Sequence, residues 1–445
     1  MARDGRSMDG IGHTPSRFMA PRLALVLATF ALVAIGLLMI FSASSVSALD
    51  DMGDPAYFLK RQAIFVAVGV AAAAIIAHFD YHLWSHTFVW PLWMGVIFLL
   101  MLTAVVGIAT KGATRWVEIA GFRFQPSEFA KPVVILMAAS LLQSIFEEGA
   151  YSFERSVGMM AVGVGIPLLL IVIQPDKGTT LIIGATVFVM AILAGFPIAY
   201  TIPVIAGAGI VALVIALGDE YSRLRILTML DPWKDPFGNG YQLIQGFYAF
   251  GSGGLTGVGL GLSRQKYAYL PEAHNDFIYA IIGEELGLVG TLGVLLLFAV
   301  IIWAGYRIAR YAPDLTGTLV SAGAASLLGI QLFINVMGVL GLFPLSGKPL
   351  PFVSYGGSAI MSSLMLVGLM VSVSRSSSLP ETEHDVRRRQ MTVREGGPSP
   401  APVFKVLDGG NPRGGRERID LGPSPAERLR GGSRSVPLND RRRNK

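Results

Sequence analysis

The 445-residue sequence contains no cysteine, so it has no disulfide, thiol nucleophile, thiolate metal site or iron–sulfur cluster. Its six histidines are scattered, without the spacing of metal ligands. Charged residues are also scarce, at 15% against 52% hydrophobic residues, and this balance excludes a soluble protein of such length. We therefore predict an all-α polytopic membrane protein.

Runs of about 20 apolar residues predict about ten transmembrane helices. The apolar run from Leu23 to Phe41 is long enough to be a retained first helix rather than a cleaved signal. We place the ten spans at 23–45, 62–79, 87–108, 129–146, 157–173, 179–195, 200–217, 277–305, 317–342 and 355–374. A long extracytoplasmic loop, 218–275, then joins helices 7 and 8.

The chain divides into a leader (1–22), a membrane body (23–375) and a polar tail (376–445). Arginines before the first span and after the last predict that both termini are cytoplasmic. The tail carries 15 Lys and Arg against 9 Asp and Glu and few bulky apolar residues, so we expect it to be disordered. Its arginine clusters can touch anionic lipid, bind a cytoplasmic partner or simply keep the tail soluble.

The outer loops and helix mouths carry many cations, against the usual positive-inside bias. Such cations could bind a phosphorylated, membrane-anchored substrate. The alternative is that they are scattered, solvated surface charges without a common role. The residues are Lys60, Arg61, Lys111, Arg115, Arg123, Lys177, Arg223, Arg225, Lys234, Arg264, Lys266 and Lys348.

The segment Tyr269–Gly287 brings a carboxylate, Asp276, to the mouth of an apolar helix. Asp276 is either the N-cap of that helix or a functional group, and Asn275 is an alternative cap. Glu284 lies deeper, where we expect buried structural pairing. The glycine run 251–261 lacks the Gly-Lys-Ser/Thr ending of a nucleotide cradle, so we expect turns or close backbone packing there.

Seven short motifs occur in a fixed order, and together they resemble the SEDS family (shape, elongation, division, sporulation) of peptidoglycan glycosyltransferases over roughly 350 positions. These motifs resemble those of the division branch of the family more closely than those of the elongation branch. A member of the sporulation branch is the alternative. The motifs are Phe58-Leu-Lys-Arg-Gln62, Gly112-Ala-Thr-Arg-Trp116, Gln125-Pro-Ser-Glu-Phe-Ala-Lys131, Gln174-Pro-Asp176, Tyr269-Leu-Pro-Glu-Ala-His274, Gly283-Glu-Glu-Leu-Gly287 and Leu350-Pro-Phe-Val-Ser-Tyr-Gly-Gly-Ser358.

The resemblance implies polymerisation of lipid II, an undecaprenyl-pyrophosphate disaccharide-pentapeptide, into glycan strands at the division septum. Asp276 matches the family's essential aspartate, which would act as general base in an inverting displacement. Arg61 and Lys131 match basic positions of its central cavity, and either can neutralise the pyrophosphate, with or without a divalent cation such as Mg²⁺ or Mn²⁺. Pro132 is expected to disturb the fourth helix and aim Lys131 inward.

The remaining candidates for substrate binding each have a structural alternative. Glu272 and His274 either touch substrate or satisfy backbone groups beside Asp276. Arg115, Gln125 and Glu128 either shape the cleft or brace the signature loop. Lys348 and Ser354 either bind an anion at the last outer loop and helix start or form a tight turn.

The sequence departs from the family pattern at Asn275, Lys177 and Ala268, but none of these departures removes the proposed base. Many relatives carry an acidic residue near position 268, and because this chain lacks it we predict no metal site. The implied partners are a class B penicillin-binding protein, other division proteins and membrane lipid, with no nucleic acid. The competing functions are a lipid II flippase, which needs alternating access to both leaflets, and a scaffold without catalysis. The charged motifs gather toward one side of the membrane, which favours an enzyme.

Overall fold

The structure is a computed structural model that describes residues 16–110, 113–119, 122–147, 149, 153–197, 207, 218, 220–267 and 269–377. The chain divides after Pro380, and the second unit, Glu381–Lys445, lies outside the described residues. The predicted tail beyond residue 377, the leader up to residue 15 and all of the seventh span except residue 207 also lie outside them.

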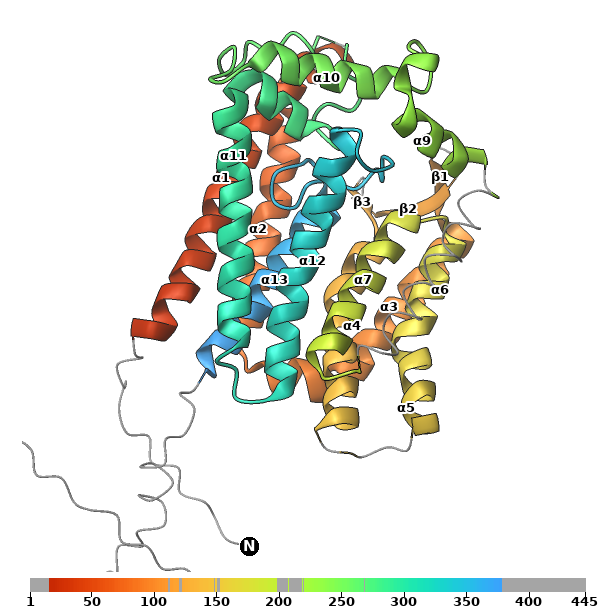
Figure 1. Cartoon of the computed structure of the whole chain (residues 1–445), viewed down its shortest axis with the longest axis vertical. Coiled ribbons are helices and arrows are strands. Elements are labelled where there is room, and N and C mark those ends of the chain that lie inside the picture. The colour runs from red at the N-terminus through yellow and green to blue at the C-terminus, as the bar shows by residue number, and fades with distance from the viewer. Residues whose placement is uncertain are drawn as a thin grey trace, which may run out of the picture. The chain divides into compact units, whose positions relative to one another are not determined.

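The described chain is mainly helical (Figure 1). Its α-helices are α1 (Ser16–Met52), α2 (Tyr57–His78), α3 (Val89–Val106), α4 (Pro126–Phe146), α5 (Phe153–Met160), α6 (Ile166–Ile173), α7 (Lys177–Leu193), α9 (Glu220–Leu230), α10 (Tyr241–Gly253), α11 (Ile278–Ala309), α12 (Leu315–Val339) and α13 (Gly357–Arg375). Short π-helical turns occupy Leu83–Thr87 and Ala161–Gly165, and Pro232–Lys234 forms a 3₁₀ turn.

Within the described ranges, seven helices are long and apolar enough to cross a membrane, and Val89–Val105 and Lys177–Leu193 are shorter apolar helices. A π-helical turn joins α5 to α6, so that Glu154–Ile173 is one of the seven spans. Each predicted span except 200–217 therefore coincides with an apolar helix. The protein is a multi-pass membrane protein, as its sequence predicts.

The start of α1 and the end of α13 lie side by side. Arg22 Nε donates to Ser374 Oγ at 3.0 Å, and Arg22 Nη2 donates to the Ser374 carbonyl at 2.7 Å. Figure 1 shows both helix ends at the lower end of the bundle and α10 at the upper end. The first and last spans therefore begin and end on the same side of the membrane.

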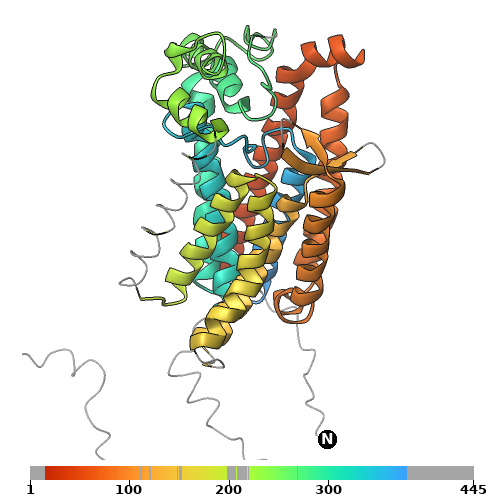
Figure 2. The same ribbon diagram turned by 90° about the vertical axis from the view of Figure 1, so that its right-hand side faces the viewer.

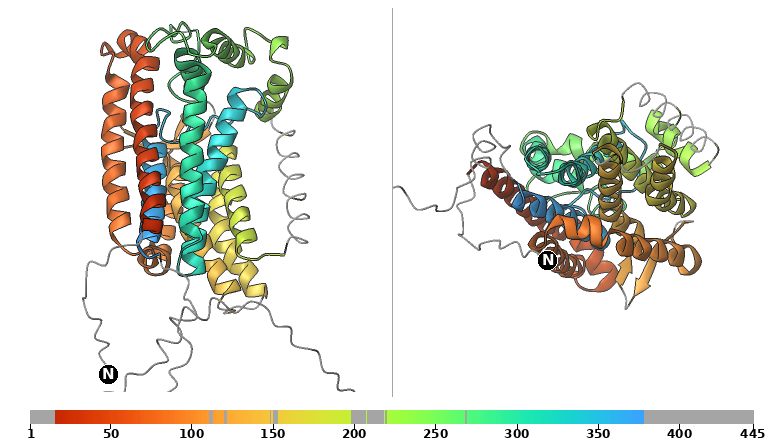
Figure 3. Two further views of the ribbon diagram at one scale, coloured as in Figure 1. Left: turned by 60° about the vertical axis from the view of Figure 1, so that its left-hand side comes forward. Right: turned by 90° about the horizontal axis from the view of Figure 1, so that it is seen from below.

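Helices α12 and α13 form the centre of the bundle. Their apolar windows are 78% and 83% buried, against 22% for α2, whose side chains largely face outward. Helix α13 packs against α2, and α11 packs against α1 on one side and α12 on the other (Figure 3). Side chains on α12 are thus held on one of the two most enclosed of these helices.

A three-stranded antiparallel sheet interrupts the helices, which the sequence did not predict. Its strands are β1 (Ile108–Thr110), β2 (Ala113–Ile119) and β3 (Phe122–Phe124), in the order β1-β2-β3. Figure 2 shows the sheet toward the end of the bundle that carries α9 and α10. Strand β2 contacts α3 and α4, so the Arg115-Trp116 motif is held against two membrane helices.

The long connection 218–275 contains two helices, α9 and α10, which the sequence pattern did not reveal. Asp231 begins the 3₁₀ turn between them, because its side chain accepts the Trp233 N–H at 3.2 Å. Helix α10 packs against α11 (Figure 2). The connection therefore covers the N-terminal end of α11, next to Asp276.

The glycine run 251–261 packs into a break in α11. Gly287 interrupts that helix with φ 67° and ψ −162°. The freed carbonyls of Glu284 and Glu285 accept the N–H groups of Val258 at 2.9 Å and Gly259 at 3.0 Å. A Cβ on Gly257 would lie 2.1 Å from the Glu285 carbonyl oxygen, so only glycine fits. The prediction of close backbone packing is confirmed.

The two glutamates before this break are buried and hydrogen bonded. Glu284 accepts the hydroxyl of Ser263 and, at 2.9 Å, the N–H of Arg264. Glu285 accepts the Ser42 hydroxyl at 2.6 Å and thereby joins α11 to α1. The structure gives Glu284 the buried pairing that we expected.

Candidate active site

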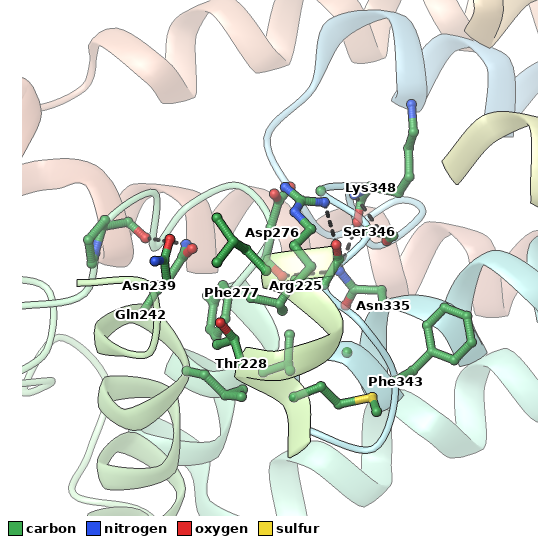
Figure 4. Close-up of a pocket in the computed structure, with 18 of the residues that line it drawn as sticks. Arg225, Thr228, Asn239, Gln242, Asp276, Phe277, Asn335, Phe343, Ser346 and Lys348 are labelled. Atoms are coloured by element: carbon green, nitrogen blue, oxygen red, sulfur yellow. Dashed lines mark hydrogen bonds between the residues drawn. The ribbon is translucent and has the colours of Figure 1, made fainter. Parts of the chain in front are cut away.

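Asp276 lines a cavity of about 350 Å³. The walls come from α9, α10, the outer end of α12 and the loop 343–348 (Figure 4). Polar groups of Arg225, Asn239 and Gln242 share this cavity with the carboxylate, and the rest of the lining mixes polar and apolar side chains. Among the described residues that line the cavity, Asp276 is the one carboxylic acid.

Asp276 does not occupy the N-cap position of α11. The N-cap residue is Phe277, whose side chain makes no capping hydrogen bond. The alternative cap, Asn275, uses its amide to donate to Glu272. The half-buried Asp276 carboxylate lines the cavity, one residue before the N-cap position.

Asn335 of α12 holds the backbone on both sides of the cavity. Its Nδ2 donates to the Asp276 carbonyl at 3.0 Å and to the Lys348 carbonyl at 2.9 Å. One buried amide thus fixes the segment that carries the carboxylate against the last outer loop. The sequence offered a signal for Asn335, because it is a polar residue in an apolar span, one turn after Gln331.

Arg225 of α9 reaches the same loop from the other side of the cavity. Its guanidinium donates to the Leu345 carbonyl. A Cβ placed on Gly347 would lie 3.5 Å from Asp276 Oδ2 and 3.7 Å from Arg225 Nη2. Gly347 therefore lies close to both the carboxylate and the guanidinium. Sequence reasoning included Arg225 only among the outer cations, since its contacts join segments far apart in the chain.

Lys348 lines the cavity, but its ammonium points away from Asp276 (Figure 4). Lys348 Nζ lies 2.7 Å from Asp176 Oδ1, and both side chains are almost fully buried. Asp176 also accepts hydrogen bonds from Gln125 Nε2 at 2.9 Å and from the hydroxyls of Ser127 and Thr179. Lys348 and Gln125 therefore meet at Asp176, at the start of α7.

The Asp176 carboxylate is strongly held in its charged form. Burial alone would raise its pKa, but the Lys348 ammonium, with help from Arg115 and the Ser127 hydroxyl, brings the pKa well below its usual range. Arg115 itself donates to the carbonyls of Gln174, at 3.3 Å, and Pro175. It thus ties strand β2 to the turn that carries Asp176.

Glu128 and Lys131 form a second buried pair in α4. Lys131 Nζ lies 2.6 Å from Glu128 Oε2 and donates to Gln331 Oε1 at 2.8 Å. Pro132 has no N–H for the Glu128 carbonyl four residues earlier, and the Ser362 hydroxyl donates to that carbonyl instead, at 2.8 Å. Lys131 points inward, as Pro132 led us to expect, and its charge is matched by Glu128.

Arg61, His274 and Ser354 gather in an aromatic cluster beside the Asp276 segment. The His274 ring lies 4.5 Å from Phe58 and 5.6 Å from Tyr355, and Arg61 Nη1 donates to Tyr57 Oη at 2.6 Å. Burial lowers the pKa of His274, opposed by the charge of Glu272, so the ring is held neutral.

Backbone bonds fix the last outer loop to this cluster. The Ser354 hydroxyl accepts the Leu350 N–H at 2.8 Å, and the Tyr355 N–H donates to the His274 carbonyl at 2.9 Å. Ser354 therefore closes a turn within the loop, whereas Glu272 lies exposed beside Asn275.

Among the described residues, no group of three or more His, Asp and Glu side chains gathers in a way that could hold a metal ion. Glu272, the acid nearest Asp276 in sequence, is engaged by the Asn275 amide.

Comparison with known proteins gives a consistent set of similarities. The family model of cell cycle proteins named for FtsW, RodA and SpoVE matches residues 23–379. Stage V sporulation protein E of Bacillus subtilis is 44% identical over 365 residues, which cover 80% of this chain and 98% of that protein. A probable peptidoglycan glycosyltransferase FtsW of Geobacter sulfurreducens is 39% identical over 355 residues, covering 79% and 94% respectively.

Solved structures show the same similarity in three dimensions. A chain from a peptidoglycan synthase complex that coordinates polymerization and crosslinking matches with a TM-score of 0.64 and 29% identity, covering 79% of this chain and 97% of that one. The rod shape determining protein RodA of Thermus thermophilus matches with a TM-score of 0.60 and 25% identity, covering 80% and 97%.

Proposed function

Because the chain belongs to the FtsW, RodA and SpoVE family of cell cycle proteins, the SEDS family, we propose that it polymerises lipid II into glycan strands during septal cell-wall synthesis. It is a peptidoglycan glycosyltransferase, in keeping with relatives that bear this name at about 39% identity over most of the chain. The observation that carries the mechanism is the position of Asp276 in the cavity beneath α9.

We assign Asp276 as the general base. With the acceptor sugar hydroxyl within about 3 Å of the carboxylate, Asp276 takes the hydroxyl proton while the oxygen attacks the donor anomeric carbon. A new glycosidic bond forms, the bond from that carbon to the pyrophosphate breaks, and the pyrophosphate leaves with the electron pair. A single displacement inverts the anomeric carbon, and the cavity presents one carboxylate rather than the close pair of a retaining enzyme.

The leaving pyrophosphate needs positive charge more than it needs a proton. The Arg225 guanidinium lines the cavity with Asp276, and we assign it to the pyrophosphate together with Arg61 of the aromatic cluster. We assign Lys131, Glu128, Gln125 and Lys348 to the support of the cavity, because their polar groups are buried in mutual contacts. The cavity's mixed polar and apolar lining suits a substrate that joins a sugar phosphate to a lipid.

The same proposal covers location and partners. We place both termini in the cytoplasm, so that the cavity opens on the outer face of the cytoplasmic membrane, and we place the protein at the septum. The matched peptidoglycan synthase complex couples polymerization to crosslinking, which supports a class B penicillin-binding protein as partner, with other division proteins around it. Any divalent cation would be carried by the pyrophosphate rather than by a protein site.

The test is reconstitution of the full chain in liposomes with labelled lipid II, with and without its class B partner. We expect glycan strands from the wild type and none from Asp276→Ala. Movement of labelled lipid II between leaflets without strand formation would contradict the proposal and favour a flippase. Fluorescence imaging of the tagged protein tests the septal location, and a uniform distribution along the cell would contradict it.

A further inference from the structure

Asn335 is buried among the residues that line the Asp276 cavity, with a relative exposure of only 4%. It comes from the last turns of α12, the enclosed helix on the far side of the cavity from α9. Both amide hydrogens point at backbone carbonyls, those of Asp276 and Lys348. These two acceptors fix which way the amide faces, because only its nitrogen can donate.

The amide oxygen of Asn335 is buried without a hydrogen-bond partner. Gln331, one turn earlier on the same face, provides the contrast. Its Nε2 donates to the Pro349 carbonyl at 2.8 Å, and its Oε1 accepts from Lys131, so both ends of that amide are satisfied. An unsatisfied buried carbonyl costs about 1–3 kcal/mol, so stability alone does not account for asparagine at position 335.

The two bonds of Asn335 connect two separate segments of the site. One carbonyl belongs to Asp276 itself, and the other belongs to Lys348, whose ammonium is anchored on Asp176 in the interior. The carboxylate is therefore linked through Asn335 and Lys348 to the start of α7. Gly347, which precedes Lys348 in the chain, has φ +65°, and a Cβ on it would lie 3.5 Å from Asp276 Oδ2, so this loop runs close beside the carboxylate.

We propose that Asn335 is a positioning residue for the glycosyl transfer, holding the Asp276 backbone so that its carboxylate meets the acceptor hydroxyl. This inference rests on the proposed role of Asp276. Asn335 does not touch the reacting atoms; it acts through the Asp276 carbonyl. Misplacing a catalytic group by about 1 Å can cost on the order of 10²-fold in rate, so loss of this amide should lower turnover rather than substrate binding.

The test compares Asn335→Ala and Asn335→Leu with the wild type in lipid II polymerisation by the full chain. Leucine has nearly the volume of asparagine but no amide N–H to donate. If Asn335→Ala is too unstable to assay, Asn335→Leu alone tests the proposal. We expect kcat to fall roughly 10- to 100-fold in both variants, with KM for lipid II within about threefold. Ser321→Ala is the matched control, because it removes another buried bond from α12, the one to the Gly305 carbonyl at 2.8 Å, far along the helix.

Three results overturn the inference. A kcat within about twofold of wild type in Asn335→Leu would show that the amide does not position the base, and so would a change confined to KM. An equal loss of kcat in Ser321→Ala would show a general effect of loosening α12. Asp276→Asn keeps the two failures apart. If it is active, the proposed role of Asp276 as general base fails too, whereas if it is inactive beside an active Asn335→Leu, the inference alone fails.

Discussion

Lys348 and Asp176 form a buried ion pair, with Nζ 2.7 Å from Oδ1, that fastens the last outer loop to the start of α7. The two residues are 172 positions apart in the sequence. The backbone of the same lysine is held by Asn335, which also holds Asp276. A buried ion pair therefore anchors the loop that lies beside the candidate base Asp276.

Removing one member of this pair should destabilise the protein severely. Lys348→Met leaves the Asp176 charge buried and uncompensated, and we expect a loss of about 3–5 kcal/mol of folding free energy. Adding Asp176→Asn removes that charge while keeping side-chain polar atoms for Gln125 and Ser127, so the double variant should be more stable than Lys348→Met alone. Thermal melting in detergent measures both. A Lys348→Met variant as stable as wild type would contradict the account.

His82 should make stability depend on pH on the opposite side of the membrane. It lies between Asp80, at 2.7 Å, and Asp314, at 2.9 Å. Burial alone would lower the pKa of His82, but the hydrogen bond to Asp80 and the charge of Asp314 outweigh burial and raise it.

Because the folded pKa of His82 is raised, its contribution to stability is fully present below about pH 6.5 and is lost as the pH rises through the folded pKa. The melting temperature should therefore fall with rising pH across that window in the wild type, and less so in His82→Gln. Identical slopes in the two proteins would rule out this role for His82.

Two glycines of α10 should respond oppositely to alanine. A Cβ on Gly253 would lie 1.9 Å from the Gly283 carbonyl oxygen, so α10 and α11 would have to separate, and we expect Gly253→Ala to cost about 1–3 kcal/mol or more. Gly251 has nothing within 4 Å of its Cβ position, so Gly251→Ala should be neutral or gain up to about 1 kcal/mol from helix propensity. Equal melting temperatures for the two variants would refute the close contact.

Ser362 and Pro132 should show coupled effects. Ser362→Ala removes the donor that serves the Glu128 carbonyl and should cost about 1–3 kcal/mol. In a Pro132→Ala background the same change should cost less, because the alanine N–H can restore the normal helix bond to that carbonyl. A double-mutant cycle on thermal stability measures the coupling, and simple additivity would argue against it.

The sequence predicted the membrane body well, because apolar runs of span length are a strong signal. The strands 108–124 were missed, since segments of three to seven residues next to a span carry little periodic pattern. Helix α9 was missed for a different reason. The segment Glu220–Leu230 mixes charged residues such as Arg223 and Arg225 with apolar residues, so the helix has no clear apolar face.

The site was only partly predictable. Asp276 was named as the match to the family's essential aspartate and Lys348 as a cation of the last outer loop, and both line the cavity. Arg225 and Asn335 were not named as site residues, because their contacts with the Asp276 and Leu345 segments depend on how α9 and α12 pack. Lys131 and Glu128 were expected near substrate from their motif, whereas their mutual 2.6 Å contact follows from packing that the sequence does not reveal.

The most direct measurement is the initial rate of lipid II polymerisation by Asp276→Asn, because asparagine keeps the shape of the side chain but cannot accept the proton. We predict a loss of on the order of 10²- to 10⁴-fold with an unchanged melting temperature. Asp54→Asn is the control, since it removes an exposed acid that pairs with Lys60 away from the cavity, and should keep its activity. A rate for Asp276→Asn within a few-fold of wild type would contradict the assignment of Asp276 as the general base.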